Sequence, residues 1–334
     1  MKPCRVMRAV ILLGIGVGVA FSRGTQQARQ AEPVRRDPAA WGSTHAGQPL
    51  PEYVTGDECL FCHRNDIGPS WAKDPHGQTI RRREDAPELA ALIRSQPALA
   101  ARANEIEFFL GGRKYLRFLK SVGYGRLALL TTRAEMAGPN QARAWYGTDP
   151  VAWDEEKFSA RCAGCHTTAV DPKTRTYSAF SLDCYTCHGV VDLKHSTNPS
   201  LVLLSRSRRR EALVITSICA SCHIRIGTSR STGLPYPNTF VPGDNLFKDF
   251  AVDFARAEDA TLNPADRHVL RNIRDVVLSG IETPTCLSCH DVHANSSHKH
   301  RRLPRLSICT ECHNAEGPLT EVKKYTVHSA LCEY

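Results

Sequence analysis

The first third of the chain alternates between apolar and polar segments that predict two kinds of element. An apolar run extends from Ala9 to Phe21. Between residues 85 and 106, Ala and Leu recur at helical spacing, and Pro87 and Pro97 interrupt the pattern. We therefore expect short helical segments in this second region.

A different period follows directly. Apolar segments at 108–110, 114–119 and 127–132 are separated by glycines, which is typical of short strands joined by tight turns. They predict a small antiparallel β insertion near residues 105–135, with the role of a scaffold or lid. Much later, Asp266-Arg267-His268 begins a pattern that predicts a helix through Val277.

The N-terminal run is typical of an export signal. Lys2, Arg5 and Arg8 precede it, and its 13 residues are short for a membrane span, which needs roughly 20. We expect residues 1–22 to be the signal, with cleavage after Ser22, and residues 23–50 to be a flexible linker. The expected location is the periplasm. An uncleaved signal would anchor the protein to the membrane, and an extracellular location is also compatible with export.

Candidate chemistry comes from one unit, Cys-x-x-Cys-His, that occurs six times. Numbered I to VI, the units are Cys59–His63, Cys162–His166, Cys184–His188, Cys219–His223, Cys286–His290 and Cys309–His313. Their second cysteines are Cys62, Cys165, Cys187, Cys222, Cys289 and Cys312. The unit is typical of covalent haem attachment, in which both thiols bond to the porphyrin and the histidine binds the iron.

Two other interpretations of the cysteines are weaker. The 18 residues between Cys165 and Cys184 fit a zinc ribbon, and each pair could form a disulfide. Neither requires histidine after every pair, because four thiolates already complete a tetrahedral zinc site. Histidine is only 14 of 334 residues, yet it follows six pairs of six. The sequence therefore predicts six covalently bound haem c groups.

Composition and charge agree with this cofactor. Hydrophobic residues are 42% of the chain, below the roughly 45–50% that is usual, and haem would supply the missing apolar surface. The net charge of +9 could suggest a nucleic-acid partner, but six haems add about twelve propionates that offset it. We expect the basic runs 206–210 and 299–302 to face propionates or solvent, and no nucleic acid to bind.

The spacing of the units predicts closely packed haems. Units II and III start 22 residues apart and units V and VI start 23 apart, which leaves little chain for anything but loops and single turns. We divide the mature protein into an N-terminal three-haem region, residues 51–200, that includes the β insertion, and a C-terminal three-haem region, residues 201–334.

The remaining histidines are candidates for the opposite face of each iron. Each unit supplies one proximal ligand: His63, His166, His188, His223, His290 and His313. The best distal candidates are His76, His195, His268, His293 and His328. His293 follows His290 too closely to reach round the same haem, so it should serve a neighbouring one. At least one of His298 and His300 is expected in a solvated loop, and His45 is either a sixth distal ligand or part of a disordered linker.

Several phrases around the units resemble the multihaem cytochromes related to cytochrome c554. The matching phrases are Tyr53 to His63 with Asp74-Pro75-His76, FSARCAGCHTTAV leading into CYTCHG, CASCHIRIGTSRSTGLPYPNTFVPGDNL, and CLSCHDVH. The resemblance covers most of the chain from about residue 51. One departure concerns unit III, where Val190 and Val191 replace the Pro-Gly of the family and His195 comes slightly late.

The resemblance implies a mainly α and irregular fold wrapped around stacked haems, and electron transport outside the cytoplasm. The leading hypothesis is an exported six-haem cytochrome with bis-histidine irons. Its expected partners are redox proteins, either a quinol oxidase-type donor or other cytochromes, and no catalytic residue is assigned. One alternative is an oxidoreductase that acts on a small nitrogen or sulfur oxyanion at one open iron. Another is a subunit of a conductive cytochrome filament.

Cys4 is expected to leave with the signal, so Cys332 is the odd cysteine of the expected mature chain. It follows Cys309 by 23 residues, the same step that separates Cys286 from Cys309. Cys332-Glu333-Tyr334 therefore looks like the start of a seventh unit, cut short, although the matching step is also compatible with accident. As the chain stands, we expect no haem at Cys332.

Overall fold

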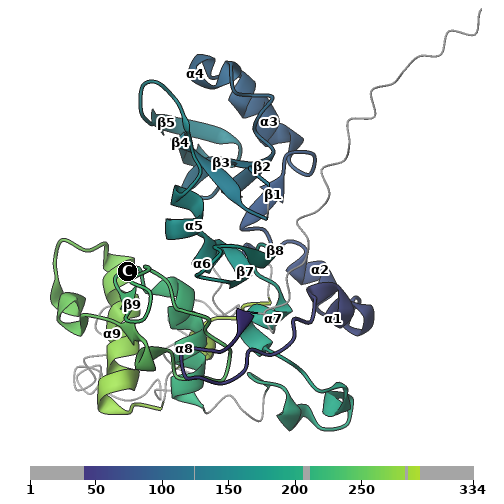
Figure 1. Ribbon diagram of the computed structural model, residues 1–334, viewed down its shortest axis with the longest axis vertical. Helices are drawn as coiled ribbons and strands as arrows, with labels where there is room; N and C mark the ends of the chain where they lie inside the picture. The colour runs from purple at the N-terminus through teal and green to yellow at the C-terminus, as the bar shows by residue number, and fades with distance from the viewer. Residues whose placement is uncertain (1–40, 124, 206–210, 283–284, 294–334) are drawn as a thin grey trace, which may run out of the picture. The chain divides into compact units, whose positions relative to one another are not determined.

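The computed structural model describes residues 41–123, 125–205, 211–282 and 285–293 (Figure 1). All of them belong to one compact unit, Pro33–Tyr334. Units I to V of the Cys-x-x-Cys-His pattern therefore fall within the description, except for the side chain of Cys289. Unit VI, the signal and Cys332 lie outside the described residues.

Short helices make up most of the α structure. The α-helices are α1 Gly56–His63, α2 Gly68–Trp71, α3 Pro87–Arg94, α4 Pro97–Ala100, α5 Lys157–Arg161, α6 Ala163–His166, α7 Cys184–His188, α8 Ala212–His223, α9 Pro264–Ser279 and α10 Cys286–Cys289. Single 3-10 turns are η2 Leu193–Ser196, η3 Pro199–Leu201, η5 Leu246–Lys248 and η6 Phe254–Glu258. Helices shorter than about 12 residues are marginal alone in water, so most of these depend on tertiary contacts.

A six-stranded antiparallel sheet lies between units I and II. Its strands are β1 Ile80–Arg82, β2 Phe108–Gly111, β3 Tyr115–Ser121, β4 Leu127–Gly138, β5 Gln141–Tyr146 and β6 Trp153–Asp154. The first five pair in chain order, and β6 also pairs with β4. Two small hairpin-like pairs, β7 Thr167–Val170 with β8 Tyr177–Phe180 and β9 Thr228–Ser229 with β10 Phe250–Ala251, flank the later units.

The two faces of this sheet bury different partners, because successive side chains along a strand point to opposite faces. Phe109 and Phe118 pack on one face against Leu89 and Ile93 of α3. On the other face, Phe108, Leu119 and Leu129 pack with Phe158 of α5 and Ala163 of α6. The sheet is therefore attached to unit II, which begins at Cys162 between these two helices.

The structure does not confirm the expectation of a mainly α fold. The predicted β insertion near 105–135 corresponds to β2, β3 and most of β4, but the sheet extends from residue 80 to residue 154. The missed strands β1 and β6 have only three and two residues, and the alternation in β5, Gln141–Tyr146, is carried largely by small alanines. They join because β2 and β4 offer them backbone hydrogen-bonding partners.

The helical predictions in the same region agree better with the structure. Pro87 and Pro97 each occupy the first position of a helix, α3 and α4. The backbone N–H at this position makes no helical hydrogen bond, so proline, which lacks it, fits there without loss. The predicted helix through His268 corresponds to α9. No helix in the described parts of the chain is long and apolar enough to cross a membrane.

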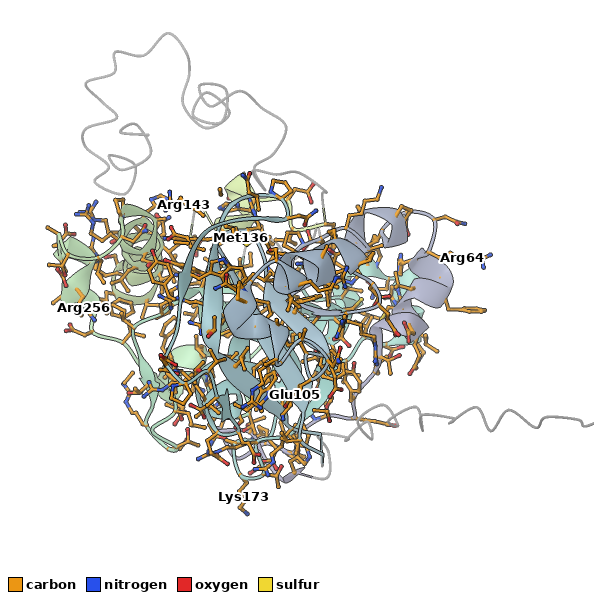
Figure 2. All side chains as sticks on the ribbon, turned by 90° about the horizontal axis from the view of Figure 1, so that it is seen from above. Arg64, Glu105, Met136, Arg143, Lys173 and Arg256 are labelled. Atoms are coloured by element: carbon orange, nitrogen blue, oxygen red, sulfur yellow. The ribbon has the colours of Figure 1, made fainter. Side chains whose placement is uncertain are left out.

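One carboxylate ties the sheet together at its edge. Glu105 (Figure 2) accepts hydrogen bonds from Lys120 Nζ at 2.8 Å, Arg102 Nη1 at 2.9 Å and Trp153 Nε1 at 2.8 Å. The ion pair with Lys120 and then that with Arg102 lower the pKa of Glu105 to about 2. The ionised form therefore favours the folded state.

We expect Glu105→Gln to reduce the acid sensitivity of folding. The folded pKa lies below the ordinary value of about 4.3 in unfolded chains, so the stabilisation is complete above that value and is lost as pH falls through about 2. Thermal unfolding measured from pH 5 to pH 2 should show a smaller drop in midpoint for E105Q than for the parent. The exposed neighbour Glu155→Gln is the control, and equal drops in all three proteins would contradict the role of Glu105.

Candidate haem-ligand site

Each described unit lies at the end of a helix. α1, α6, α7 and α8 all end at the histidine of their unit, and His290 directly follows α10. In an α-helix, residues i, i+3 and i+4 share one face. The two thiols and the imidazole of a unit therefore project from the same side of its helix, as attachment of one planar cofactor requires.

Cysteines of different units contact each other directly. The Cys59 thiol interacts with Cys184, which lowers the pKa of Cys59 to about 7. The same kind of contact joins Cys165 to Cys222, and Cys219 to Cys286. These contacts link unit I to III, II to IV, and IV to V. Units that are 57 to 125 residues apart in sequence therefore meet at the atoms that would carry their haems.

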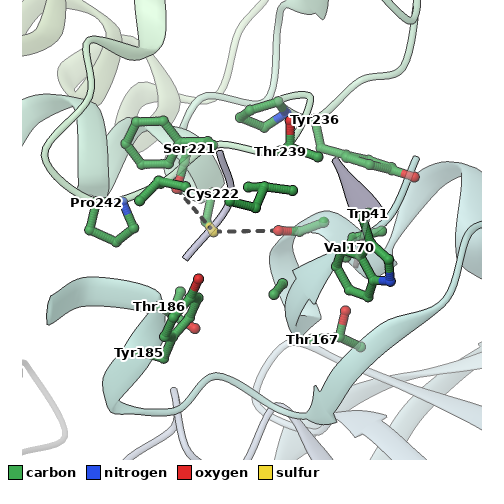
Figure 3. A pocket seen from close by; sticks show the side chains of 16 residues that line it. Trp41, Thr167, Val170, Tyr185, Thr186, Ser221, Cys222, Tyr236, Thr239 and Pro242 are labelled. Atoms are coloured by element: carbon green, nitrogen blue, oxygen red, sulfur yellow. Dashed lines mark hydrogen bonds between the residues drawn. The ribbon is translucent and has the colours of Figure 1, made fainter. Parts of the chain in front are cut away.

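Units II, III and IV surround one pocket. Its lining includes Gly164 of unit II, Thr186 of unit III and Cys222 of unit IV (Figure 3). The Cys222 thiol donates to the Gly164 carbonyl at 3.8 Å. A Cβ at Gly164 would lie 2.2 Å from the ring of Tyr236. This position inside unit II therefore accepts only glycine.

Three pairs of histidine rings lie close together, and each pair joins a unit to a histidine outside it. The ring centroids of His63 and His195 are 6.0 Å apart, and those of His188 and His293 are also 6.0 Å apart. His76 and His223 are 6.2 Å apart. The sequence had predicted His76, His195 and His293 as distal ligands without identifying the unit that each one serves.

These separations fit one metal ion between two imidazoles. Metal–nitrogen bonds to histidine are about 2 Å long, and about 1 Å separates each nitrogen from its ring centre, so two trans ligands have centroids roughly 6 Å apart. The rings of the His63 and His188 pairs are nearly parallel, at 26° and 29°. The rings of His76 and His223 are inclined by 71°.

Hydrogen bonds prepare four of these imidazoles for ligation. The Nδ1 atoms of His63 and His76 donate to Asp66 at 3.1 Å and to Asp74 at 3.0 Å. Two further Nδ1 atoms donate to backbone carbonyls at 2.8 Å, His188 to Leu203 and His195 to Asp192. All four partners only accept, so Nδ1 carries the proton and the lone pair of Nε2 remains available for a metal, a common arrangement for ligating histidines.

Sequence reasoning missed these acceptors. Asp66 stands three residues after His63, and Asp74 stands two residues before His76. An aspartate within three residues of a candidate histidine is the signal that could have found them. The carbonyls of Leu203 and Asp192 gave no such signal, because a backbone acceptor carries no sequence identity.

Unit II has a distinct electrostatic environment. His166 is largely buried, and this burial, followed by the charges of Arg225 and Arg117, lowers the pKa of its imidazole to about 4. The Cys162 thiol also feels the charge of Arg117, although burial raises the pKa of this thiol overall. Unit II is therefore the unit that the β insertion supplies with positive charge.

The other candidate histidines differ in their surroundings. His268 lies on α9, where Asn272 Nδ2 donates to its Nε2 at 3.0 Å. His45 has both ring nitrogens buried, and no hydrogen-bond partner for them occurs in the described residues. The predicted proximal ligand His313, the distal candidates His298, His300 and His328, and the cysteines Cys309 and Cys312 lie outside the described residues.

His45 lies in the last part of the predicted linker. Residues 41–50 form a turn closed by the bridge between Ser43 and Pro49, and Leu50 is buried. A buried imidazole without a partner is costly, which is the situation expected of a ligand seen without its metal.

We expect each distal histidine to control the spin state of one iron. His195→Ala should convert one ferric haem from low spin to high spin, because it removes one of two strong axial ligands, and His76→Ala should convert a different haem. Electron paramagnetic resonance of the oxidised protein measures both changes. Ser196→Ala, in the same turn as His195, is the matched control, and an unchanged low-spin spectrum in H195A would contradict the pairing with His63.

Comparisons with known proteins support the interpretation of the fold. No protein-family model matches the sequence, and no curated protein matches it. Among solved structures, the outer cell wall cytochrome OcwA is similar with a TM-score of 0.52 and 19% identity, over 80% of this chain and 68% of that one. An undecahaem cytochrome from the S-layer of Carboxydothermus ferrireducens gives a TM-score of 0.44 at 15% identity, over 80% of this chain and 44% of that one. With its helix-borne units and paired imidazoles, the chain has the fold of a multihaem cytochrome.

Proposed function

We propose that the protein is an exported six-haem c-type cytochrome that carries electrons between redox partners. The observation that carries this proposal is the set of three imidazole pairs at 6.0–6.2 Å, each of which joins a Cys-x-x-Cys-His histidine to one distant in sequence. When bound, haem c supplies an iron that alternates between the ferric and ferrous states. A pair of imidazoles at each iron would suit this role, because it would leave no position for a substrate.

The contacts between cysteines support an order for the array. Unit I contacts unit III through Cys59 and Cys184, and unit IV contacts unit V through Cys219 and Cys286. Cys187 of unit III lies close enough to Cys222 of unit IV for its pKa to respond to that thiol, although burial is the larger cause of the increase. We infer a main line I–III–IV–V, with unit II joined to unit IV as a side branch.

The ligand assignments follow from the same geometry. We assign His195 to the iron of unit I, His293 to that of unit III and His76 to that of unit IV. His45, His268 and His328 are the proposed partners for units II, V and VI. Of these, His45 has the strongest support, because both its ring nitrogens are buried without a partner in the described part of the chain.

Unit I is the proposed site of exchange with a partner protein. Phe61, between its two cysteines, is 81% exposed, and Leu193, two residues before His195, is 86% exposed. On α1, Phe61 lies about 200° around the helix from Cys59, on the side opposite the thiols and His63, so a haem would leave it exposed. Apolar side chains at a surface mark sites of contact with other proteins.

The proposed location follows from export. The expected covalent attachment to Cys-x-x-Cys-His and the predicted signal support a location outside the cytoplasm, and the similar cytochrome OcwA is named for the outer cell wall. We propose the periplasm or cell surface, and a relationship to cytochrome c554 on the phrases quoted above. The proposed partners are other cytochromes or a quinol-oxidising donor.

The haem count and the spin states test this function together. Intact mass of protein made in a host with cytochrome maturation machinery should show six haem additions, and the oxidised protein should be low-spin throughout. A haem-free native protein that holds zinc would contradict the proposal. A stoichiometric high-spin signal that shifts on addition of nitrite, hydroxylamine or a sulfur oxyanion would instead favour an oxidoreductase with one open iron.

A further inference from the structure

Two arginines lie directly opposite each other on neighbouring strands, on the face of the sheet that packs toward unit II. Arg117 of β3 is the direct cross-strand partner of Arg133 of β4. Both are half-buried. Like charges directly opposite in an antiparallel pair destabilise it, and burial, with the charge of Arg133 as a further cause, lowers the pKa of Arg117. The pair therefore costs folding free energy unless something negative lies beside it.

Within the described residues, the protein provides no carboxylate for this pair. The nearest one along β4 is Glu135, and it already accepts hydrogen bonds from Arg143 and Tyr146. The Arg133 Nε atom is buried and has no hydrogen-bond partner in the described part of the chain. The Arg133 guanidinium instead lies over the rings of Tyr115, at 4.7 Å, and Tyr146, at 5.5 Å.

The arginine pair lies next to the chemistry of unit II. The charge of Arg117 acts on both the Cys162 thiol and the His166 imidazole, so its guanidinium is near both groups. The same face of the sheet continues into the apolar cluster of Leu119 and Leu129, against which Cys162 packs. Arg117 thus borders the position at which unit II would hold its haem, and Arg133 lies beside Arg117 on the neighbouring strand.

We propose that Arg117 and Arg133 form a binding site for a carboxylate or similar oxyanion beside unit II. A planar guanidinium binds two oxygens of such a group at once, and the anion would relieve the repulsion across the strands. One possible source of the anion is a propionate of the haem proposed at unit II, so this part of the inference rests on the proposed function. The other source is a free oxyanion from solution.

This site would give the β insertion an electrostatic role. The sheet holds the charge of Arg117 near unit II, with Arg133 directly beside it, and positive charge near an iron favours its reduced state. Removal of one arginine should therefore make the haem of unit II harder to reduce. The other described units lack this pair, so the effect should fall on one haem.

The experiment compares Arg117→Leu and Arg133→Gln with the parent in a potentiometric titration followed by visible absorption. We expect each variant to retain six haems by intact mass and to shift the reduction equilibrium of one haem about tenfold toward the oxidised form, which is a midpoint lower by about 59 mV. Arg143→Gln is the matched control, because Arg143 belongs to the same sheet, is 67% exposed and pairs with Glu135 (Figure 2). It should leave all midpoints unchanged.

Addition of sodium sulfate or sodium nitrite separates the two sources. If a free oxyanion fills the site, the parent midpoint should depend on the concentration of the salt at constant ionic strength, and R117L should lose this dependence. If a propionate fills it, the parent should not respond to the added anion, while the midpoint shift of R117L persists. Both results support the site.

Six haems with unchanged midpoints in R117L and R133Q, and no response of the parent to either anion, would overturn the inference and leave the proposed function intact. A unit II peptide without haem would instead contradict the proposed function. In that case the anion site would be tested by sulfate binding alone, measured by calorimetry. A loss of sulfate affinity in R117L smaller than tenfold would overturn the proposed anion site.

Discussion

The helical spacing of Cys-x-x-Cys-His is the constraint on which the rest of this structure depends. Residues i, i+3 and i+4 of a helix share a face, so each unit presents two thiols and one imidazole to the same side. Five units are described, and each lies at the end of a helix. The helices need be only long enough to orient one unit, which explains why α6, α7 and α10 have one turn or little more. Such helices cannot be stable alone, and contacts between units therefore hold the array together.

Closure of each site requires residues from remote parts of the chain. His195 reaches His63 across 132 residues, and His76 reaches His223 across 147. Each of these two distal imidazoles is anchored through Nδ1 by an acceptor within three residues, Asp192 or Asp74. A local hydrogen bond thus fixes the ring, and the long-range fold brings it to its partner. If every iron is bound by one imidazole of a unit and one from a distant segment, each iron would cross-link two segments of the chain.

The β insertion connects the rest of the fold to unit II. One face of the sheet is covered by α3 and α4, and the other is attached to α5 and α6. Unit II follows directly from that attachment, and Arg117 and Arg133 extend the same face. The sheet therefore offers unit II both an apolar support and fixed positive charge. If the units hold haems, such local charge would be one of the few means by which the protein could give one of these identical cofactors a different potential.

The amino-acid sequence by itself determined the units, their proximal histidines and the central strands of the sheet, because each depends on residues within one turn or one strand of each other. It also predicted His76, His195 and His293 as ligands. Only the tertiary structure decided which unit each of them faces, that Cys59 contacts Cys184, and that β1, β5 and β6 join the sheet. It also showed the buried nitrogens of His45 and the opposition of Arg117 and Arg133. These features depend on contacts between segments far apart in the chain, and periodicity and spacing carry no information about such contacts.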